Sequence, residues 1–538
     1  MKSGKLFKLG VVASVSLVLY LLLALQYPLG PSLDDPRATW ASMVEPTWLN
    51  AVYHLLIYLG ITLLYFVLLR LLTSSDMERE PNHRRLIGII LVAWLACSVV
   101  LMFMAPAGES HDIFDYLFRG RLMTEYQANP LVDVPEDFDL SMPYSRYLAW
   151  RKYVDTYGPV WETTSAAVSS GVHQVAEWLG WWNEDAPVCP KSPESCRLLI
   201  AYISGYRLLA IALTGLSGWL IYSMVSHRQT TLALLALAAW LLNPLTLLAT
   251  AVGGHNDAVM LVLVLSSWWL LQRERPFPAM LALILATHVK LTALIWLPAC
   301  ALWIVWRWGW GRALKVGVAS LASGLALSWI LYAPFGGWGS LPRMLDERSR
   351  FLANSGWRIF YHQLIYRWGW HWQRALQLST TLANWLFVAG ALVIPLWAFN
   401  FRPRRFDEPL DPADVERRLW RTLAVVSMLY LIVGSFWFQH WYVLWVLAPA
   451  VLSPNHRFSR FLLPGLVFGA LSSNVAMSFL LATILESAPR MVSYITVVGI
   501  IWGPLLIAIG ALILKRWLSR SQSTILSYGD ASLKTKTP

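Results

Sequence analysis

Two aspartates, Asp112 and Asp115, lie three positions apart immediately after an apolar stretch of the chain. If this segment is helical, both carboxylates lie on one face, because residues i and i+3 are neighbours on a helix. A carboxylate that an ordered loop shields from water can be tuned to act as a general base. The alternative interpretation is that both acids are solvated and stabilise the first turn of a helix through its dipole.

Two later clusters combine a turn with polar side chains. Residues 157–159 are Tyr-Gly-Pro, which marks a turn, and Glu162 follows them. Aromatic rings at such a turn could stack on a sugar or anchor the chain at the membrane interface. Residues 253–257 lie between two apolar stretches, where polar groups are costly unless they have partners. They could contact a ligand or form a capped turn that opens the next helix. The polar residues of this second turn are His255, Asn256 and Asp257.

Three cationic or titratable side chains complete the set of candidates. Lys290 lies between two apolar pieces that are short for membrane spans, and an ionisable residue within a membrane is a functional candidate by default. Alternatively, its amino group extends to the membrane surface. His440 lies in the aromatic turn 435–442 and could bind a phosphate or a sugar, or be a solvated residue in an interfacial aromatic belt. Arg348 lies in a polar loop with two other arginines.

The elements that must hold these residues are membrane helices. The chain has 538 residues, of which 57% are hydrophobic and 14% charged, whereas soluble proteins have about 25% charged residues. Apolar stretches of about 20 residues recur, each long enough to cross a bilayer as a helix. The composition predicts an all-α polytopic membrane protein and excludes a soluble globular domain. The net charge of +12 does not indicate a nucleic-acid partner, because the basic residues cluster in short loops between apolar stretches.

We expect about 12–14 membrane spans from the apolar stretches. Their approximate ranges are 8–26, 50–72, 86–105, 199–222, 231–251, 257–271, 278–289, 291–306, 315–333, 379–399, 421–436, 441–453, 458–480 and 492–514. The pair between residues 278 and 306 could be two short spans or one hairpin that enters from the cytoplasm. The strongly basic loops all lie on one side of this arrangement. The positive-inside rule makes that side cytoplasmic, together with both termini.

Two polar segments, 106–198 and 334–378, fall on the outer side with all of the candidate clusters. Long loops in compact proteins are usually functional. An outer group of carboxylates, histidine, lysine and arginine over an apolar body suits a substrate with an anionic head and a lipid tail. Residues 1–515 thus form one transmembrane domain with a partly helical outer loop domain. Residues 516–538 form a polar cytoplasmic tail that we expect to be disordered.

Cys189 and Cys196 lie in the first outer segment. A disulfide is permitted outside the cytoplasm, and we predict that these two cysteines form one. A metal site is less favoured there, because no second pair of Cys or His lies nearby in the sequence.

The order of these motifs resembles bacterial glycosyltransferases of the GT-C fold, and most of all the polyprenyl-phosphate-mannose-dependent α-mannosyltransferases. The shared motifs are Asp112-x-x-Asp115-Tyr116-x-x-x-Gly120, Asn129-Pro130, Tyr157-Gly158-Pro159, the turn from Gly253 to Asp257, Lys290 with Thr292, and the run from Ser435 to Tyr442. Each motif is short, so the resemblance depends on their order. The sequence departs from the family at Asp115, where relatives often have a small polar residue, and at Gln439, which replaces the first His of a late pair. An insertion with Cys189 and Cys196 is a third departure.

The resemblance implies transfer of a sugar, expected to be mannose, from polyprenyl phosphate to a hydroxyl of a glycan, glycolipid or protein acceptor. Asp112 matches the family's general base, which would take the acceptor proton as the oxygen attacks the anomeric carbon with inversion. Lys290, His440 and Arg348 would stabilise the departing phosphate. The other residues expected to contact substrate are Asp115, Tyr116, Asn129, Tyr157, Glu162, His255, Asn256 and Asp257.

We therefore expect a plasma-membrane enzyme with its active site on the outer face and with membrane lipids around it. No metal or other cofactor is expected, because a phosphate leaving group already carries its charge. A transporter or flippase of a lipid-linked sugar is an alternative, but transporters usually place polar sites near the midplane between repeated halves. A lipid-sugar polymerase or ligase is a third class, and the outer motifs above would not be expected in it.

Overall fold

The computed structural model describes residues 3–34, 45–73, 83–107, 109–138, 143–180, 197–349, 352–399, 412–456 and 458–533. This part of the chain folds into helices and contains two isolated β-bridges but no strand. The all-α fold predicted from composition is therefore confirmed. The predicted disulfide between Cys189 and Cys196 lies outside the described residues.

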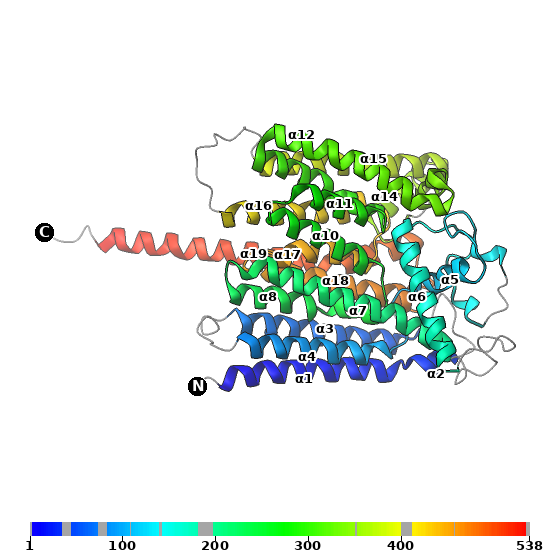
Figure 1. The fold of residues 1–538 in the computed structure, drawn as a ribbon. Helices are drawn as coiled ribbons and strands as arrows, with labels where there is room; N and C mark the ends of the chain where they lie inside the picture. The colour runs from blue at the N-terminus through cyan, green and yellow to red at the C-terminus, as the bar shows by residue number, and fades with distance from the viewer. Residues whose placement is uncertain are drawn as a thin grey trace.

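Fourteen helices of the described chain, most of them long, lie side by side in one bundle (Figure 1). They are α1 (Ser3–Gln26), α3 (Trp48–Leu72), α4 (His83–Met102), α7 (Arg197–Ser226), α8 (Thr230–Leu241), α9 (Pro244–Ala251), α10 (Asp257–Gln272), α11 (Pro276–Thr287), α12 (Leu297–Tyr332), α15 (Trp372–Ala398), α16 (Pro412–Leu429), α17 (Leu444–Val451), α18 (Leu463–Val475) and α19 (Arg490–Leu533). Each forms because a backbone that crosses an apolar layer must pair its own N–H and C=O groups.

Eight helical segments of the described chain are long and apolar enough to cross a membrane, and the bent pair α8–α9 is a ninth candidate. The protein is thus a polytopic membrane protein. The number of full-length helices is lower than the expected 12–14 spans, because several apolar stretches form helices of only 10–17 residues. Two short helices, α9 and α17, are buried along their whole length. A helix that is apolar on all sides and lies inside a bundle need not have the length of a membrane span.

The continuous helical segment Leu291–Phe335, most of which is α12, contains two of the expected spans, 291–306 and 315–333. At Gly309 the backbone leaves the helical region (φ 80°, ψ 169°), a conformation that glycine tolerates best. The ring of Tyr332, at the end of α12, lies 5.9 Å from the ring of His288, which precedes its first arm. The chain therefore reverses at Gly309 and returns to the level at which it started.

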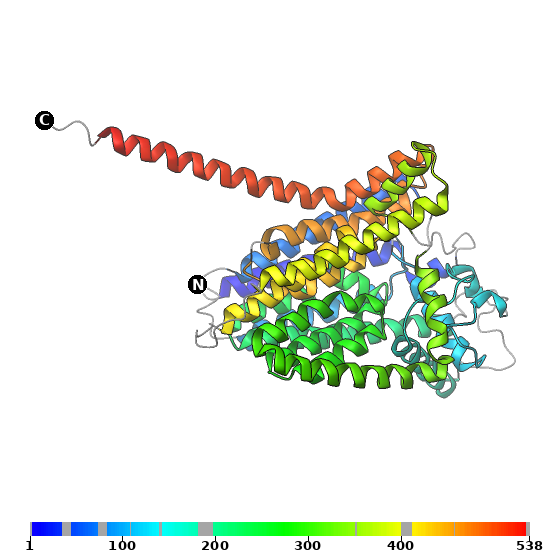
Figure 2. The same ribbon diagram turned by 90° about the horizontal axis from the view of Figure 1, so that it is seen from above.

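The two polar segments form a cap at one end of the bundle (Figure 1). The first contains α5 (Asp112–Thr124), α6 (Pro159–Trp178) and two 3₁₀ turns (Pro135–Asp137 and Pro143–Tyr147), and α2 (Leu29–Asp34) lies beside it. The second contains α13 (Leu341–Ser349) and α14 (Gly356–Tyr366). α1 begins, and α19 ends, at the opposite end of the molecule (Figures 1 and 2).

α19 extends well beyond the bundle (Figure 2). It includes residues 516–533, for which composition predicts a disordered tail. That expectation is corrected, because the helix continues to Leu533. Residues 516–533 contain no proline and one glycine, so a helix that has started in the apolar span can propagate through them.

Candidate active site

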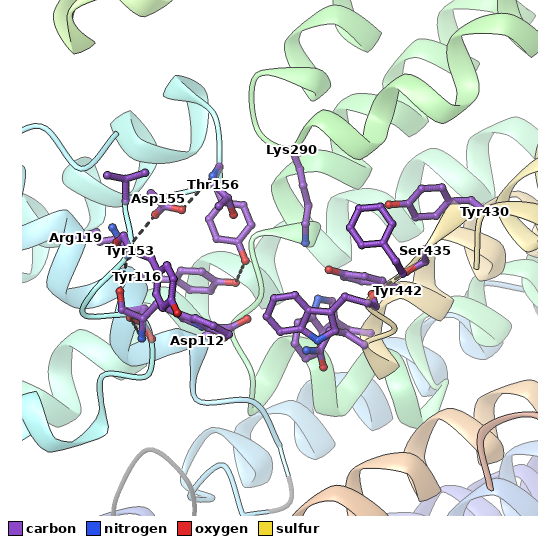
Figure 3. A pocket seen from close by; sticks show the side chains of 18 residues that line it. Asp112, Tyr116, Arg119, Tyr153, Asp155, Thr156, Lys290, Tyr430, Ser435 and Tyr442 are labelled. Atoms are coloured by element: carbon purple, nitrogen blue, oxygen red, sulfur yellow. Dashed lines mark hydrogen bonds and ion pairs between the residues drawn. The ribbon is translucent and has the colours of Figure 1, made fainter. Parts of the chain in front are cut away.

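A cavity of about 110 Å³ lies where the cap meets the ends of the helices (Figure 3). Its walls come from three parts of the chain: α5 with the loop that leads to α6, the turn at Lys290, and residues 430–442. The candidates from the sequence that line it are Asp112, Asp115, Tyr116, Tyr157 and Lys290. The fold thus brings four of the predicted clusters together in one site, because residues of the aromatic turn 435–442 line the cavity as well.

Both aspartates lie in the first turn of α5, on the helix expected from their spacing. The indole N–H of Trp150 donates to Oδ1 of Asp112 (3.3 Å). The two carboxylate oxygens of Asp115 accept from the backbone N–H groups of Ala149 (3.4 Å) and Trp150 (3.2 Å). The solvated alternative is therefore not observed, because each acid holds the loop that covers it.

The two carboxyls differ in their electrostatic environments. Asp115 is 3% exposed, and burial raises its pKa to about 8, although the charge of Arg119 acts in the opposite direction. Burial also raises the pKa of Asp112, but hydrogen bonds and the charge of Lys290 lower it, and its side chain is only half-buried. Asp112 is therefore better placed to be ionised and open to the cavity, whereas Asp115 is largely protonated at neutral pH.

Lys290 is buried and does not extend to the surface. Its Nζ lies 2.9 Å from Oδ2 of Asp257, whose other oxygen accepts from the indole of Trp445 (2.6 Å). The ammonium also lies over the rings of Tyr157 (5.3 Å) and Tyr442 (5.1 Å). A carboxylate and aromatic faces both stabilise a buried cation, so Lys290 keeps its charge at the cavity wall.

The Tyr-Gly-Pro turn is held against the Lys290 turn by backbone hydrogen bonds. The N–H of Gly158 donates to the carbonyl of Val289 (3.1 Å), and the N–H of Val160 donates to that of His288 (3.0 Å). A Cβ at position 158 would overlap the His288 carbonyl, so the close approach requires glycine. This contact places Tyr157 beside Lys290.

The turn that precedes α10 is buried throughout. Asp257 serves as the counter-ion of Lys290. His255 stacks on Trp441, with ring centroids 3.8 Å apart. The Asn256 side chain makes no capping hydrogen bond, and its polar atoms have no partner among the described residues. The turn therefore supports the cavity from behind, and its three polar residues do not line it.

His440 does not line the cavity either. Its Nε2 lies 2.6 Å from Oε2 of Glu109, and both side chains are buried. Tyr58 donates to the other oxygen of Glu109 (3.3 Å). This pair connects the segment before α5 with the turn that carries Trp441. Sequence reasoning missed Glu109, although it lies three positions before Asp112.

Arg119 and Asp155 line the cavity and form an ion pair (Nε–Oδ2 3.3 Å) that the sequence did not reveal. Glu162, a predicted site residue, lies behind this pair and is fully buried. Burial and the neighbouring Asp155 charge raise the pKa of Glu162 well above its ordinary value. Glu162 therefore lies outside the cavity wall and does not reach the cavity.

Two other predicted residues lie away from the cavity. Asn129 holds a turn, in which its Oδ1 accepts from the N–H of Leu131 (3.0 Å) and its own N–H donates to Asp133 (2.8 Å). Arg348 belongs to α13, and its side chain lies outside the described part of the structure. Among the described residues, no three His, Cys, Asp or Glu side chains are grouped as ligands for a metal ion.

A polytopic helical body with a loop cap at one end of the bundle agrees with the GT-C class that the order of the motifs predicts. A family model for the N-terminal domain of alpha-(1->6)-mannopyranosyltransferases matches residues 7–307 of this chain. The match covers more than half of the sequence, and the chain belongs to this family. No curated protein matches the chain. The protein is therefore a mannosyltransferase, as the order of its motifs predicts.

Proposed function

We propose that this enzyme transfers a mannosyl group from a polyprenyl-phosphate donor to a hydroxyl of a glycan acceptor, with inversion at the anomeric carbon. The observation that carries the proposal is that Asp112 and Lys290 line one cavity at the capped end of the helix bundle (Figure 3). A single displacement needs a base for the acceptor proton and a positive charge for the departing phosphate, and Asp112 and Lys290 can supply them.

Asp112 is the general base in this mechanism. The acceptor oxygen forms a bond to the anomeric carbon while the bond from that carbon to the phosphate oxygen breaks. The acceptor proton moves to Asp112, and the charge of the leaving phosphate is stabilised by Lys290. Asp115 is the weaker candidate for the base, because it is buried and both of its oxygens already accept hydrogen bonds from the loop that covers it.

The two ends of the cavity carry different kinds of side chain (Figure 3). This difference supports an assignment of the acceptor to one end and of the donor to the other. One end holds Arg119 and Asp155 from the cap, and the other holds Tyr430 and Tyr442 from the α16–α17 region (Figure 3). Charged groups that bond hydroxyls suit the acceptor glycan. Aromatic groups at the ends of membrane helices suit the donor, whose isoprenoid chain enters from the bilayer.

Of the remaining predicted residues, His440 is reassigned. Its partner Glu109 occupies Nε2, and its ring is buried away from the cavity, which supports a positioning role for the α5 entry and the Trp441 turn. Asp115, Tyr116 and Tyr157 remain candidates for substrate contact, because they line the cavity.

We further propose that the cavity faces outward across the plasma membrane. Arg273, Arg307 and Arg312 all lie at the turns opposite the cap, next to Glu274. Basic turns mark the cytoplasmic side, so the capped end is the outer one. Nucleotide-linked sugars are cytoplasmic, which supports a lipid-linked donor for an outer site.

The direct test is to incubate the purified protein with polyprenyl-phosphate mannose and a short α-mannoside acceptor. We expect loss of the donor, release of polyprenyl phosphate and a longer acceptor with an α-linkage. The rate should be unchanged by EDTA, because no metal is proposed. GDP-mannose and the Asp112→Asn variant are the controls. Transfer from GDP-mannose, or movement of the donor lipid across a vesicle without its consumption, would contradict the proposal.

A further inference from the structure

A second cavity lies at the end of the bundle opposite the active site and has a volume of about 490 Å³. Three separate elements form it: the α7–α8 turn, α16, and the loop after α17. Its basic lining residues are Arg228, Arg417, Arg421 and His456. No carboxylate occurs among the described residues that line it, so the cavity is strongly positive.

A carboxylate beside the cavity, Glu416, is already engaged. Glu416 pairs with Arg228 and lies 3.4 Å from Nε2 of His227. Glu416 thus holds Arg228 against α16. Arg417 and Arg421 on the same helix add two further basic side chains to the cavity wall. The positive-inside rule explains why arginines occur at this end, but it does not explain why they converge on one hollow.

Arg417 and Arg421 are separated by four positions on α16. Like charges at i and i+4 repel and destabilise a helix by about 0.2–0.5 kcal/mol. Both guanidinium groups line the cavity and can donate to one anion bound there. Guanidinium groups present forked N–H donors that match the oxygens of a phosphate, which makes phosphate the fitting anion.

Part of the remaining cavity wall is apolar, and this part favours a lipid as the source of the phosphate. Val225, Leu232 and Leu452 line it, from three of the helices that form the bundle. A free phosphate or a nucleotide gains nothing from such a wall, whereas the glycerol and first acyl carbons of a phospholipid do. Basic pockets between membrane helices at the cytoplasmic side are suited to anionic headgroups.

We propose that this cavity binds the phosphate headgroup of an anionic phospholipid, with Arg417 and Arg421 on the phosphate oxygens and the apolar wall against the glycerol backbone. The site is separate from the active-site cavity and does not depend on the proposed sugar-transfer mechanism.

The test compares two double variants of the full chain that remove the same charge. Arg417→Gln/Arg421→Gln removes the arginines of the cavity. Arg275→Gln/Arg312→Gln removes two exposed arginines at the same end of the molecule but outside the cavity. Binding of phosphatidylglycerol to delipidated protein is titrated by native mass spectrometry, with phosphatidylcholine as the zwitterionic comparison. Each arginine near a headgroup contributes about 1 kcal/mol, so the cavity variant should bind phosphatidylglycerol at least about tenfold more weakly.

A third variant tests the site without removing an arginine. Asn455 is an exposed lining residue, and Asn455→Glu places a carboxylate in the cavity at little risk to folding. It should also weaken phosphatidylglycerol binding and leave phosphatidylcholine binding unchanged. Equal phosphatidylglycerol affinity in the cavity and control variants would overturn the proposal. So would millimolar inorganic phosphate that displaces the lipid and stabilises the protein by itself, because the site would then recognise the free anion.

Discussion

Asp112 and Asp115 differ by one turn of α5, yet their environments assign them different tasks. The indole of Trp150 and the charge of Lys290 favour the ionised form of Asp112, which faces the cavity. Asp115 is buried and uses both oxygens to hold the backbone of the covering loop. A motif with two acids therefore contains one candidate base and one structural acid.

Replacing Asp112 by Asn should reduce turnover by at least about a hundredfold, because a general base contributes roughly 10²–10⁴-fold. The amide keeps the size and can accept the Trp150 hydrogen bond, so thermal unfolding and donor binding should change little. Asp115→Asn is the matched control one turn away. It should be milder, because Asn resembles the protonated acid that burial favours at this position. Steady-state transfer assays on both variants check this. Near-normal turnover of Asp112→Asn would show that Asp112 is not the general base.

The pH dependence of kcat/KM should contain an acidic limb that belongs to Asp112. Only the ionised carboxylate accepts a proton, so the rate falls as pH decreases through its pKa. Burial raises that pKa above the ordinary value of about 3.9. Because the charge of Lys290 lowers the pKa, Lys290→Gln should shift the limb to higher pH as well as reduce the maximal rate. Lys315→Gln, at an exposed position on α12, is the control with the same change of charge. If the acidic limb lies at the same pH in both variants, the charge of Lys290 does not lower the pKa of Asp112, and the prediction is wrong.

At the scale of the elements, the site depends on contacts between turns and less on any single helix. The turn before α6 is joined to the turn after α11 by two backbone hydrogen bonds. The Glu109–His440 pair joins the entry of α5 to the start of the α17 region. These two connections hold all three walls of the cavity together.

The Gly158→Ala variant tests the first of these connections. The added methyl group would overlap the carbonyl of His288, so the two turns must separate and Tyr157 must move away from Lys290. Displacement of about 1 Å in an active site can cost a hundredfold in rate, and we expect a loss of that order with a lower Tm. Gly171→Ala in the middle of α6 is the control, since nothing lies within 4 Å of its Cβ. It should keep full activity and raise helix stability slightly. Full activity of Gly158→Ala would show that the contact is dispensable.

At the scale of the whole molecule, polar chemistry is concentrated at one end of the bundle and positive charge at the other. The cap carries the active-site cavity, and the opposite end carries the basic turns and the second cavity. The start of α1 also lies at that opposite end (Figures 1 and 2). Because basic turns favour one side of the membrane, this distribution of charge predicts a single orientation of the protein in the bilayer.

Single cysteines at Asp137 and Glu274, in a chain whose natural cysteines are replaced, should report this direction. Both positions are exposed, one in the cap and one in the turn between α10 and α11. A membrane-impermeant maleimide should label position 137 in intact cells and position 274 only after permeabilisation. Labelling of both from outside would contradict the proposed orientation, and the reverse pattern would place the active site in the cytoplasm.

Asp112 was singled out from Asp115 only by the resemblance to a known family, whereas the residues by themselves determined the class of fold and the elements that carry the motifs. These properties are local, because an apolar stretch must satisfy its own backbone groups as a helix and basic turns select one side of the membrane. The family resemblance was equally readable, because it depends on the order of short motifs along the chain.

Only the tertiary structure decided which residues meet. Lys290 pairs with Asp257, Arg119 with Asp155, and His440 with the unpredicted Glu109. It also decided that α9 and α17 are short buried helices and that α12 reverses at Gly309. The physical reason is that an ionisable group buried in a membrane protein requires a partner, but its chemistry does not specify which one. The packing of segments far apart in the chain determines the partner. In this fold Asp112 and Lys290 line the cavity, whereas His440 does not.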